Sequence, residues 1–149
     1  MPELNLVEKV IALEGVELLA GLGPDQLASI ATIATEVPCR PGCAMLAEAE
    51  PVDALYVVVE GSAALSRNGE AVGIAGAGTV IGVWALFDQQ DPLRLTATGR
   101  EDTRLLRIGR EEFYDLLADN SDITAAIFST LVKRFERLAG QSPVGKDEL

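Results

Sequence analysis

The sequence has 149 residues and a mass of 15.8 kDa, which is the size of one ordinary domain with a buried core. It is 48% hydrophobic, and 12 basic against 23 acidic side chains give a net charge of −11, a field that opposes binding to a nucleic-acid backbone. It contains no histidine, which excludes Ser-His-Asp and Cys-His catalysis and metal binding through imidazole.

Two helices are predicted at the start of the chain. Apolar residues at helical spacing, from Leu4 through Val7 to Ile11, predict a short amphipathic helix that ends near Leu13. Pro24 suits a first helical position, and the apolar stripe that follows it predicts a second helix.

The region from about residue 35 to residue 110 is predicted to consist of short strands joined by tight turns. Its strongest strand is Leu55-Tyr56-Val57-Val58-Val59. The pair Asn68-Gly69 lies between two β-leaning segments and indicates a hairpin. Short strands at this spacing are typical of a sandwich or barrel rather than of an α/β sheet.

Helical spacing returns over about residues 110–139. Phe113, Leu116 and Leu117 share one face of a first short helix. A longer helix is predicted to follow Asn120-Ser121-Asp122 and to run to about Ala139, and residues 140–149 are predicted to form a loose tail. The apolar stripe of the longer helix is Ile123, Ile127, Leu131 and Phe135.

The two cysteines, Cys39 and Cys43, flank the turn-forming residues Arg40-Pro41-Gly42. A tight turn there would bring two thiols together as a redox switch. The interpretation that we favour from sequence is two small, half-buried hydrophobic side chains.

A cytoplasmic location is predicted. The first residues carry the acids Glu3 and Glu8 where a signal peptide needs bases, and no apolar stretch is long enough to span a membrane. The chain ends in the letters of an endoplasmic-reticulum retention address, which we interpret as coincidence because no secretory signal accompanies them.

Several segments in order give the sequence a family resemblance. They are Asp53-Ala54-Leu55-Tyr56-Val57-Val58-Val59-Glu60-Gly61, then Gly78-Thr79-Val80-Ile81-Gly82, then Glu101 to Ile108 with Glu111-Glu112-Phe113. Together they resemble the cyclic nucleotide-binding domain family over roughly residues 5–139. The resemblance implies one mainly β domain over residues 1–139. Its eight-stranded β-roll would span about 35–110, with N-terminal helices before it and a C-terminal helix pair over about 110–139.

The resemblance also locates a ligand cassette. In this family the cyclic phosphate rests in a loop after the pattern Gly-Glu-x-x-Leu; the glutamate binds the ribose and an arginine pairs with the phosphate. Here Gly82 is kept, Val83 stands at the glutamate position, and the arginine position falls on Leu93. The cassette positions of this sequence are Gly82, Val83, Trp84, Ala85, Leu86, Leu93 and Arg94. Both polar anchors are apolar, so the resemblance implies a degenerate site and no bound cofactor.

An alternative keeps nucleotide binding. Arg94 lies one residue from the arginine position, and a bulge would bring it inward to the phosphate, with Gly82 and the backbone amides of residues 83–85 completing the site. Alternation opposes this, because Leu93, Leu95 and Ala97 share one strand face and Arg94 lies on the other.

The predicted function is therefore a non-catalytic regulatory or interaction module that acts through protein contacts, with a cyclic AMP or cyclic GMP sensor as the alternative. The partner is predicted to be another protein or a second copy of this chain, with neither DNA binding nor membrane insertion. Relatives pair through the helix that corresponds to the long C-terminal one, so its apolar stripe is the candidate dimer interface. The alternative is that this stripe packs on its own barrel. The candidate residues are Ile123, Ile127, Leu131 and Phe135.

Overall fold

The computed structural model describes residues 3–47, 53–83 and 95–140. Its helices are α1 (Leu6–Glu14), the short 3-10 helix η1 (Glu17–Leu19), α2 (Pro24–Ile33), α4 (Arg110–Asp119) and α5 (Ser121–Gly140). Its strands are β1 (Ala34–Cys39), β2 (Ala44–Leu46), β3 (Ala54–Glu60), β4 (Ser62–Arg67), β5 (Glu70–Gly76), β6 (Val80–Ile81), β7 (Thr96–Gly99) and β8 (Thr103–Gly109). Among these helices none is long and apolar enough to cross a membrane.

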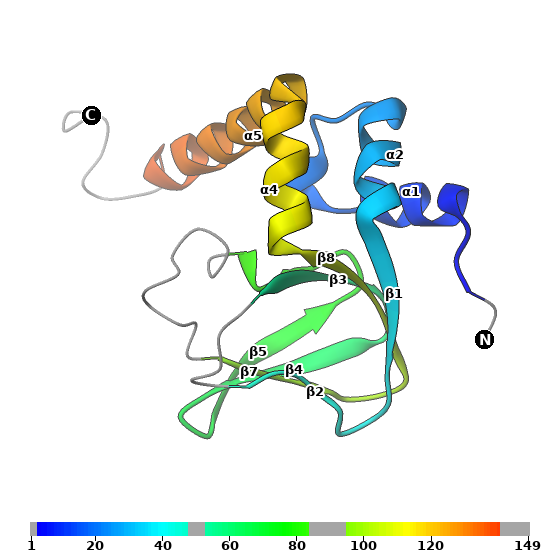
Figure 1. The fold of residues 1–149 in the computed structure, drawn as a ribbon. Coiled ribbons are helices and arrows are strands. Elements are labelled where there is room, and N and C mark those ends of the chain that lie inside the picture. Colours follow the sequence, from blue (N-terminus) through cyan, green and yellow to red (C-terminus); the bar gives the residue numbers. More distant parts are fainter. Residues whose placement is uncertain (1–2, 48–52, 84–94, 141–149) are drawn as a thin grey trace.

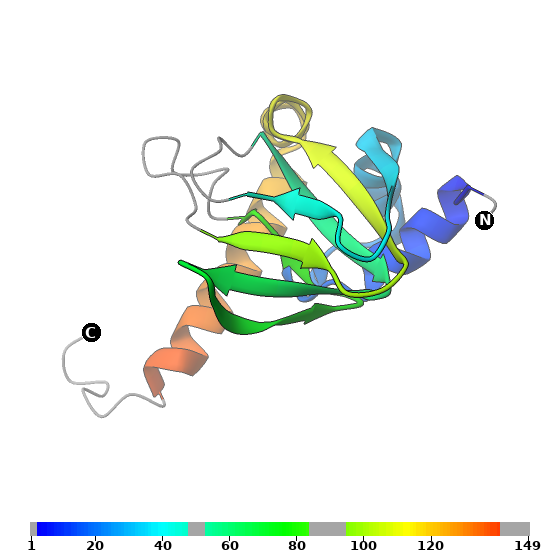
Figure 2. The same cartoon turned by 90° about the horizontal axis from the view of Figure 1, so that it is seen from below.

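The described strands form two four-stranded antiparallel sheets that face each other as a β-roll (Figures 1 and 2). The order is β1-β8-β3-β6 in one sheet and β2-β7-β4-β5 in the other. The chain passes from the first sheet to the second at the corner between β1 and β2. The predicted mainly β fold, an eight-stranded roll with flanking helices, is confirmed.

The described helices cover the outer face of the β1-β8-β3-β6 sheet, and none of them packs on the outer face of the other sheet (Figure 1). Alternation along β8 explains how this sheet serves two cores. Leu106 and Ile108 pack against the helices, whereas Leu105, the residue before Leu106, belongs to the interior of the roll. Residues from both ends of the chain meet in the helical core, where Leu13 and Ile123 are each almost fully buried.

The turn chemistry follows from the residues. Asn68 and Gly69 both have positive φ, 53° and 80°, as a two-residue hairpin between β4 and β5 requires. The Asn5 side chain caps α1 by accepting a hydrogen bond from Glu8 N at 2.8 Å. In return, the Glu8 side chain accepts a hydrogen bond from Asn5 N at 3.1 Å. The predicted helix boundaries are met to within one or two residues.

A hydrogen bond joins α2 to the start of α5 and perturbs a carboxyl group. Gln26 Nε2 donates to Asp122 Oδ2 at 2.7 Å, and this bond is the main reason why the pKa of Asp122 lies below its ordinary value. A lowered folded-state pKa means that the bond stabilises the fold above the unfolded pKa, and that this stability is lost as the pH falls through the folded pKa.

We expect Gln26→Ala to raise the pKa of Asp122 toward its ordinary value. The free energy of unfolding of this variant should then fall less steeply as the pH is lowered. The part of the stability change that depends on pH is small because Asp122 is exposed, and loss of the bond from Gly23 N to Gln26 Oε1, at 2.9 Å, adds a cost that does not depend on pH. An NMR titration of the carboxyl carbon measures the pKa directly. An Asp122 pKa that is the same in both proteins would contradict the assignment of the shift to Gln26.

Candidate functional site

The cassette begins where β6 ends. Ile81 lies opposite Tyr56 of β3 and is buried in the roll, and Gly82 follows it with φ of 95°. Only glycine adopts that conformation without strain, so the backbone at this position requires a glycine. Val83 comes next and is half-buried. The first two cassette residues are thus a buried glycine and a half-buried apolar side chain.

Of the predicted cassette residues, the structure describes Gly82 and Val83. The other positions lie outside the described residues: Trp84, Ala85, Leu86, Leu93 and Arg94. The choice between Leu93 and Arg94 as the inward-facing side chain therefore stays a prediction.

The interior of the roll is apolar. Val58 and Leu105 come from one sheet and the small side chains of Ala63, Ala75 and Ala97 from the other, each 1% exposed or less. These five buried side chains provide no charge and no hydrogen-bond donor to a ligand inside the roll, and the half-buried Tyr56, which packs against them, carries a hydroxyl but no charge. A ligand held there would depend for polar contacts on the cassette and on the end of the roll beside it.

The register brings a cation, Arg107, to that end. Arg107 lies opposite Tyr56, which is opposite Ile81, the residue before Gly82. It lies two residues beyond Leu105 and so shares the interior face of β8. Its Nη2 atom is 3.4 Å from Oδ2 of Asp53, so its charge already has a carboxylate partner. Sequence reasoning missed Arg107 because only strand register places it beside the cassette.

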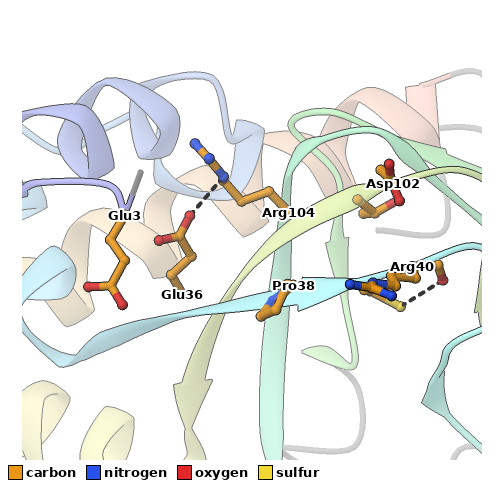
Figure 3. A pocket seen from close by; sticks show the side chains of 8 residues that line it. Glu3, Glu36, Pro38, Arg40, Asp102 and Arg104 are labelled. Carbon is orange, nitrogen blue, oxygen red and sulfur yellow. Dashed lines mark hydrogen bonds and ion pairs between the residues drawn. The ribbon is translucent and has the colours of Figure 1, made fainter. Parts of the chain in front are cut away.

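A separate cavity of about 460 Å³ lies at the other end of β8 (Figure 3). Its central contact is an ion pair in which Arg104 Nε is 2.7 Å from Glu36 Oε1, with side chains 10% and 16% exposed. Glu60 lies 3.6 Å from the same guanidinium, so this arginine is not available as a free anion site. The lining residues are Glu3, Glu36, Pro38, Cys39, Arg40, Asp102, Thr103 and Arg104.

The corner between β1 and β2 corrects one sequence interpretation. Cys39 and Cys43 form a disulfide, with their Cα atoms 5.5 Å apart, so the interpretation as two separate small hydrophobic side chains is wrong. Gly42 has φ of 86°, and Cys43 N donates to Arg40 O at 2.9 Å, so Pro41-Gly42 forms a type II turn. That turn is what brings the two cysteines within bonding distance.

The apolar stripe of α5 divides into a buried and an exposed half. Ile123 and Ile127 are 1% and 7% exposed and pack in the helical core of their own chain, so they cannot form the predicted dimer interface in this conformation. Leu131 and Phe135 are 38% and 63% exposed. Five large apolar side chains of α5 are exposed. Four of them, which we call the α5 seam, are Phe128, Leu131, Phe135 and Leu138, and the fifth is Val132.

Within the described ranges, no three His, Cys, Asp or Glu side chains come together in a group that could hold a metal ion. Every buried side-chain nitrogen or oxygen in the same ranges has a hydrogen-bond partner.

Comparisons with known proteins relate this chain to a family and to two regulatory proteins. The family model of the cyclic nucleotide-binding domain matches residues 36–120. The chain is 31% identical over 113 residues to a cAMP-dependent protein kinase regulatory subunit of Aspergillus niger, a match that covers 74% of this chain and 27% of the relative. It is 24% identical over 136 residues to a CRP-like cAMP-activated global transcriptional regulator of Mycobacterium tuberculosis, covering 88% and 59%. The chain thus spans about a quarter and three fifths of the lengths of these relatives.

The fold is also similar to a crystal structure of the N-terminal domain of a transcriptional regulator from Streptomyces coelicolor A3(2). The TM-score is 0.78 at 25% sequence identity, and the match covers 91% of this chain and 96% of the other.

Proposed function

Because the chain belongs to the cyclic nucleotide-binding domain family, we propose that it is a non-catalytic regulatory module, one domain over residues 1–139, that does not bind cyclic nucleotide in the usual way. The observation that carries the proposal is Val83. It follows the buried, left-handed Gly82 at the position where the family has its ribose-binding glutamate, and it is half-buried. A valine side chain cannot accept a hydrogen bond from a ribose hydroxyl.

The expected loss of affinity is large. A buried charge without a partner costs several kcal/mol, whereas micromolar affinity corresponds to about 8 kcal/mol in total. Among the described residues, the interior cluster of the roll offers no compensating charge, and Arg107 at its end is paired with Asp53. The two relatives named above are described as cAMP-dependent and cAMP-activated. The proposal is that this chain keeps their fold and has lost their ligand.

Protein contacts would then provide the output, and the α5 seam supports self-association. Its residues follow one another at steps of three, four and three, which is the 3.5-residue period of a coiled-coil seam. Two of them, Phe128 and Phe135, are 66% and 63% exposed, which is unusual for side chains of this size in a soluble monomer. We propose a homodimer in which the second half of α5 pairs with the same segment of a second copy. A net charge of −11 makes DNA an unfavourable partner.

A thermal-shift titration of the full chain with millimolar cyclic AMP and cyclic GMP tests the loss of binding. A ligand at about a hundred times its dissociation constant adds about 2.7 kcal/mol, or about 5–10 °C for a domain of this size. We expect a shift of less than about 1 °C with either nucleotide. A clear shift would overturn the proposal and make Arg94 and Arg107 the first residues to replace.

A gain-of-binding variant sharpens the same test. Val83→Glu combined with Leu93→Arg restores both polar anchors of the family cassette, so we expect a shift of several degrees with cyclic nucleotide. Val83→Met with Leu93→Met is the matched control, because it keeps similar side-chain lengths without the carboxylate acceptor and without the charges. A folded Glu-and-Arg variant that still fails to bind would show that these two positions do not explain the loss.

A further inference from the structure

The β1–β2 corner is held in place by hydrogen bonds as well as by its disulfide. Cys43 N donates to Arg40 O at 2.9 Å within the turn. Both backbone groups of Gly99 on β7 also bind the turn: Gly42 N donates to Gly99 O and Gly99 N donates to Cys43 O, each at 2.8 Å. None of these bonds depends on the sulfur–sulfur bond. These bonds therefore keep the backbone of the two cysteines close together when the disulfide is reduced, while the two sulfur atoms move apart by side-chain rotation.

The corner also has acceptors ready for a reduced thiol. Sγ of Cys39 lies 3.4 Å from the carbonyl oxygen of Cys43 and 3.9 Å from that of Arg40, whose side chain lies beside the cavity (Figure 3). An S–H group at Cys39 would donate to these oxygens without moving the backbone. The same backbone conformation thus offers acceptors to a reduced Cys39.

From these observations we propose that Cys39 and Cys43 form a reversible thiol/disulfide site that exchanges with dithiols of the dithiothreitol or thioredoxin class. Two thiols kept next to each other have a high effective concentration, which favours re-formation of the bond. Access is unequal, because Cys39 is 2% exposed whereas Cys43 is only half-buried. Cys43 is therefore the sulfur that an incoming thiolate attacks.

The exchange balances in two steps. A thiolate of the dithiol attacks Sγ of Cys43, the bond to Cys39 breaks, and Cys39 leaves as a thiolate that takes up a proton. The second thiolate of the reductant then attacks the reductant's first sulfur, which is bonded to Cys43 in the mixed disulfide. Cys43 is released as a thiolate, which is protonated in turn. Two electrons and two protons pass to the protein, and the dithiol becomes a disulfide.

Gly99 of β7 packs directly against the disulfide corner, so reduction of the bond is expected to affect β7. A Cβ atom placed on Gly99 would lie 2.8 Å from Arg40 O and 3.2 Å from Sγ of Cys39, so the turn and β7 are packed in direct contact. β7 follows the cassette residues in the sequence and pairs with β2. Release of the disulfide loosens this corner, and the hydrogen bonds of β2 and β7 are the ones expected to open more often.

The first experiment uses the wild-type chain. Millimolar dithiothreitol is added to the folded protein, the thiols are alkylated and counted by mass spectrometry, and oxidised glutathione is then used to restore the bond. We expect two alkylated thiols, a folded reduced protein whose melting temperature is lower by about 4–8 °C, and full recovery on reoxidation. Hydrogen exchange should rise in residues 44–46 and 96–99 and stay unchanged in α1.

Two single-cysteine variants test the direction of attack. Cys39→Ser leaves Cys43 alone and Cys43→Ser leaves Cys39 alone, so the pair is matched in composition. In the folded state we expect a thiol reagent to modify the lone Cys43 at least about tenfold faster than the lone Cys39, because of their difference in exposure. The double serine variant should melt at the temperature of the reduced wild type and show no response to dithiothreitol.

Three results would overturn the proposal. The first is a bond that stays closed in the folded wild type under dithiothreitol, which would make it a permanent structural link. The second is a reduced protein that is unfolded at room temperature, and the third is a reduced protein that does not reoxidise. All three are read on the wild type, so a variant that fails to fold does not affect the decision.

Discussion

Replacement of Gly61 by alanine is expected to be the most destabilising single change considered for this fold. Gly61 joins β3 to β4 with φ of 87°, a conformation that costs an alanine about 1–2 kcal/mol. The added methyl carbon would also lie 2.6 Å from both Asp102 O and Thr103 Oγ1, and the latter accepts a hydrogen bond from Ser62 N. Overlap of this kind costs about 1–3 kcal/mol more, because backbone atoms cannot move aside cheaply.

The sum is a loss of about 2–5 kcal/mol in the free energy of unfolding, or a fall in melting temperature of about 5–20 °C. Two other glycines separate the causes. Gly69 has φ of 80° and nothing within 4 Å of its added carbon, so Gly69→Ala carries the conformational cost alone. Gly73 has neither a positive φ nor a close neighbour, so Gly73→Ala should change stability by less than about 0.5 kcal/mol.

Chemical denaturation measures the free energy of unfolding of the three variants. The expected order of stability is Gly73→Ala, then Gly69→Ala, then Gly61→Ala. If Gly61→Ala were as stable as Gly69→Ala, the close approach of residues 102 and 103 to this turn would be wrong.

Phe135→Glu is expected to weaken self-association by about 100-fold. Each copy of a dimer built on the α5 seam would bury this ring, which is 63% exposed in the single chain. Removal of that burial from both copies costs at least about 3 kcal/mol, and two facing carboxylates add repulsion. Analytical ultracentrifugation over a range of protein concentrations gives the dissociation constant.

Ser129→Glu is the matched control, because it adds one carboxylate to an exposed position of the same helix outside the seam. This variant should sediment like the wild type. A wild-type chain that is monomeric at the highest soluble concentration would contradict the proposed dimer, as would a Phe135→Glu variant with the wild-type dissociation constant.

The elements of the fold could be predicted from sequence because their signals are local. The pair Asn68-Gly69 predicts a hairpin through the backbone freedom of two residues, and both have the expected positive φ. Apolar spacing likewise separated the helical ends of the chain from the strands between them.

The features that sequence missed depend on contacts between distant residues. Arg107 reaches the cassette end of the roll only through the pairing of β8 with β3 and of β3 with β6. The stripe on α5 is continuous in sequence, and nothing local marks where the helix leaves the body of the domain, between the buried Ile127 and the exposed Phe128 and Leu131. The disulfide was missed because two cysteines in a sequence give no redox state, whereas the type II turn fixes their separation.

The pairing of the first strand with the last has a consequence for how the protein is made. Ala34 of β1 pairs with Ile108 of β8, and β8 also separates β1 from β3 in their sheet. During synthesis, β1 therefore leaves the ribosome long before its partner does, and the helix-covered sheet cannot close until about two thirds of the chain has been translated. Nascent chains that stall before Thr103 would present an unpaired strand and an uncovered apolar face to chaperones and proteases.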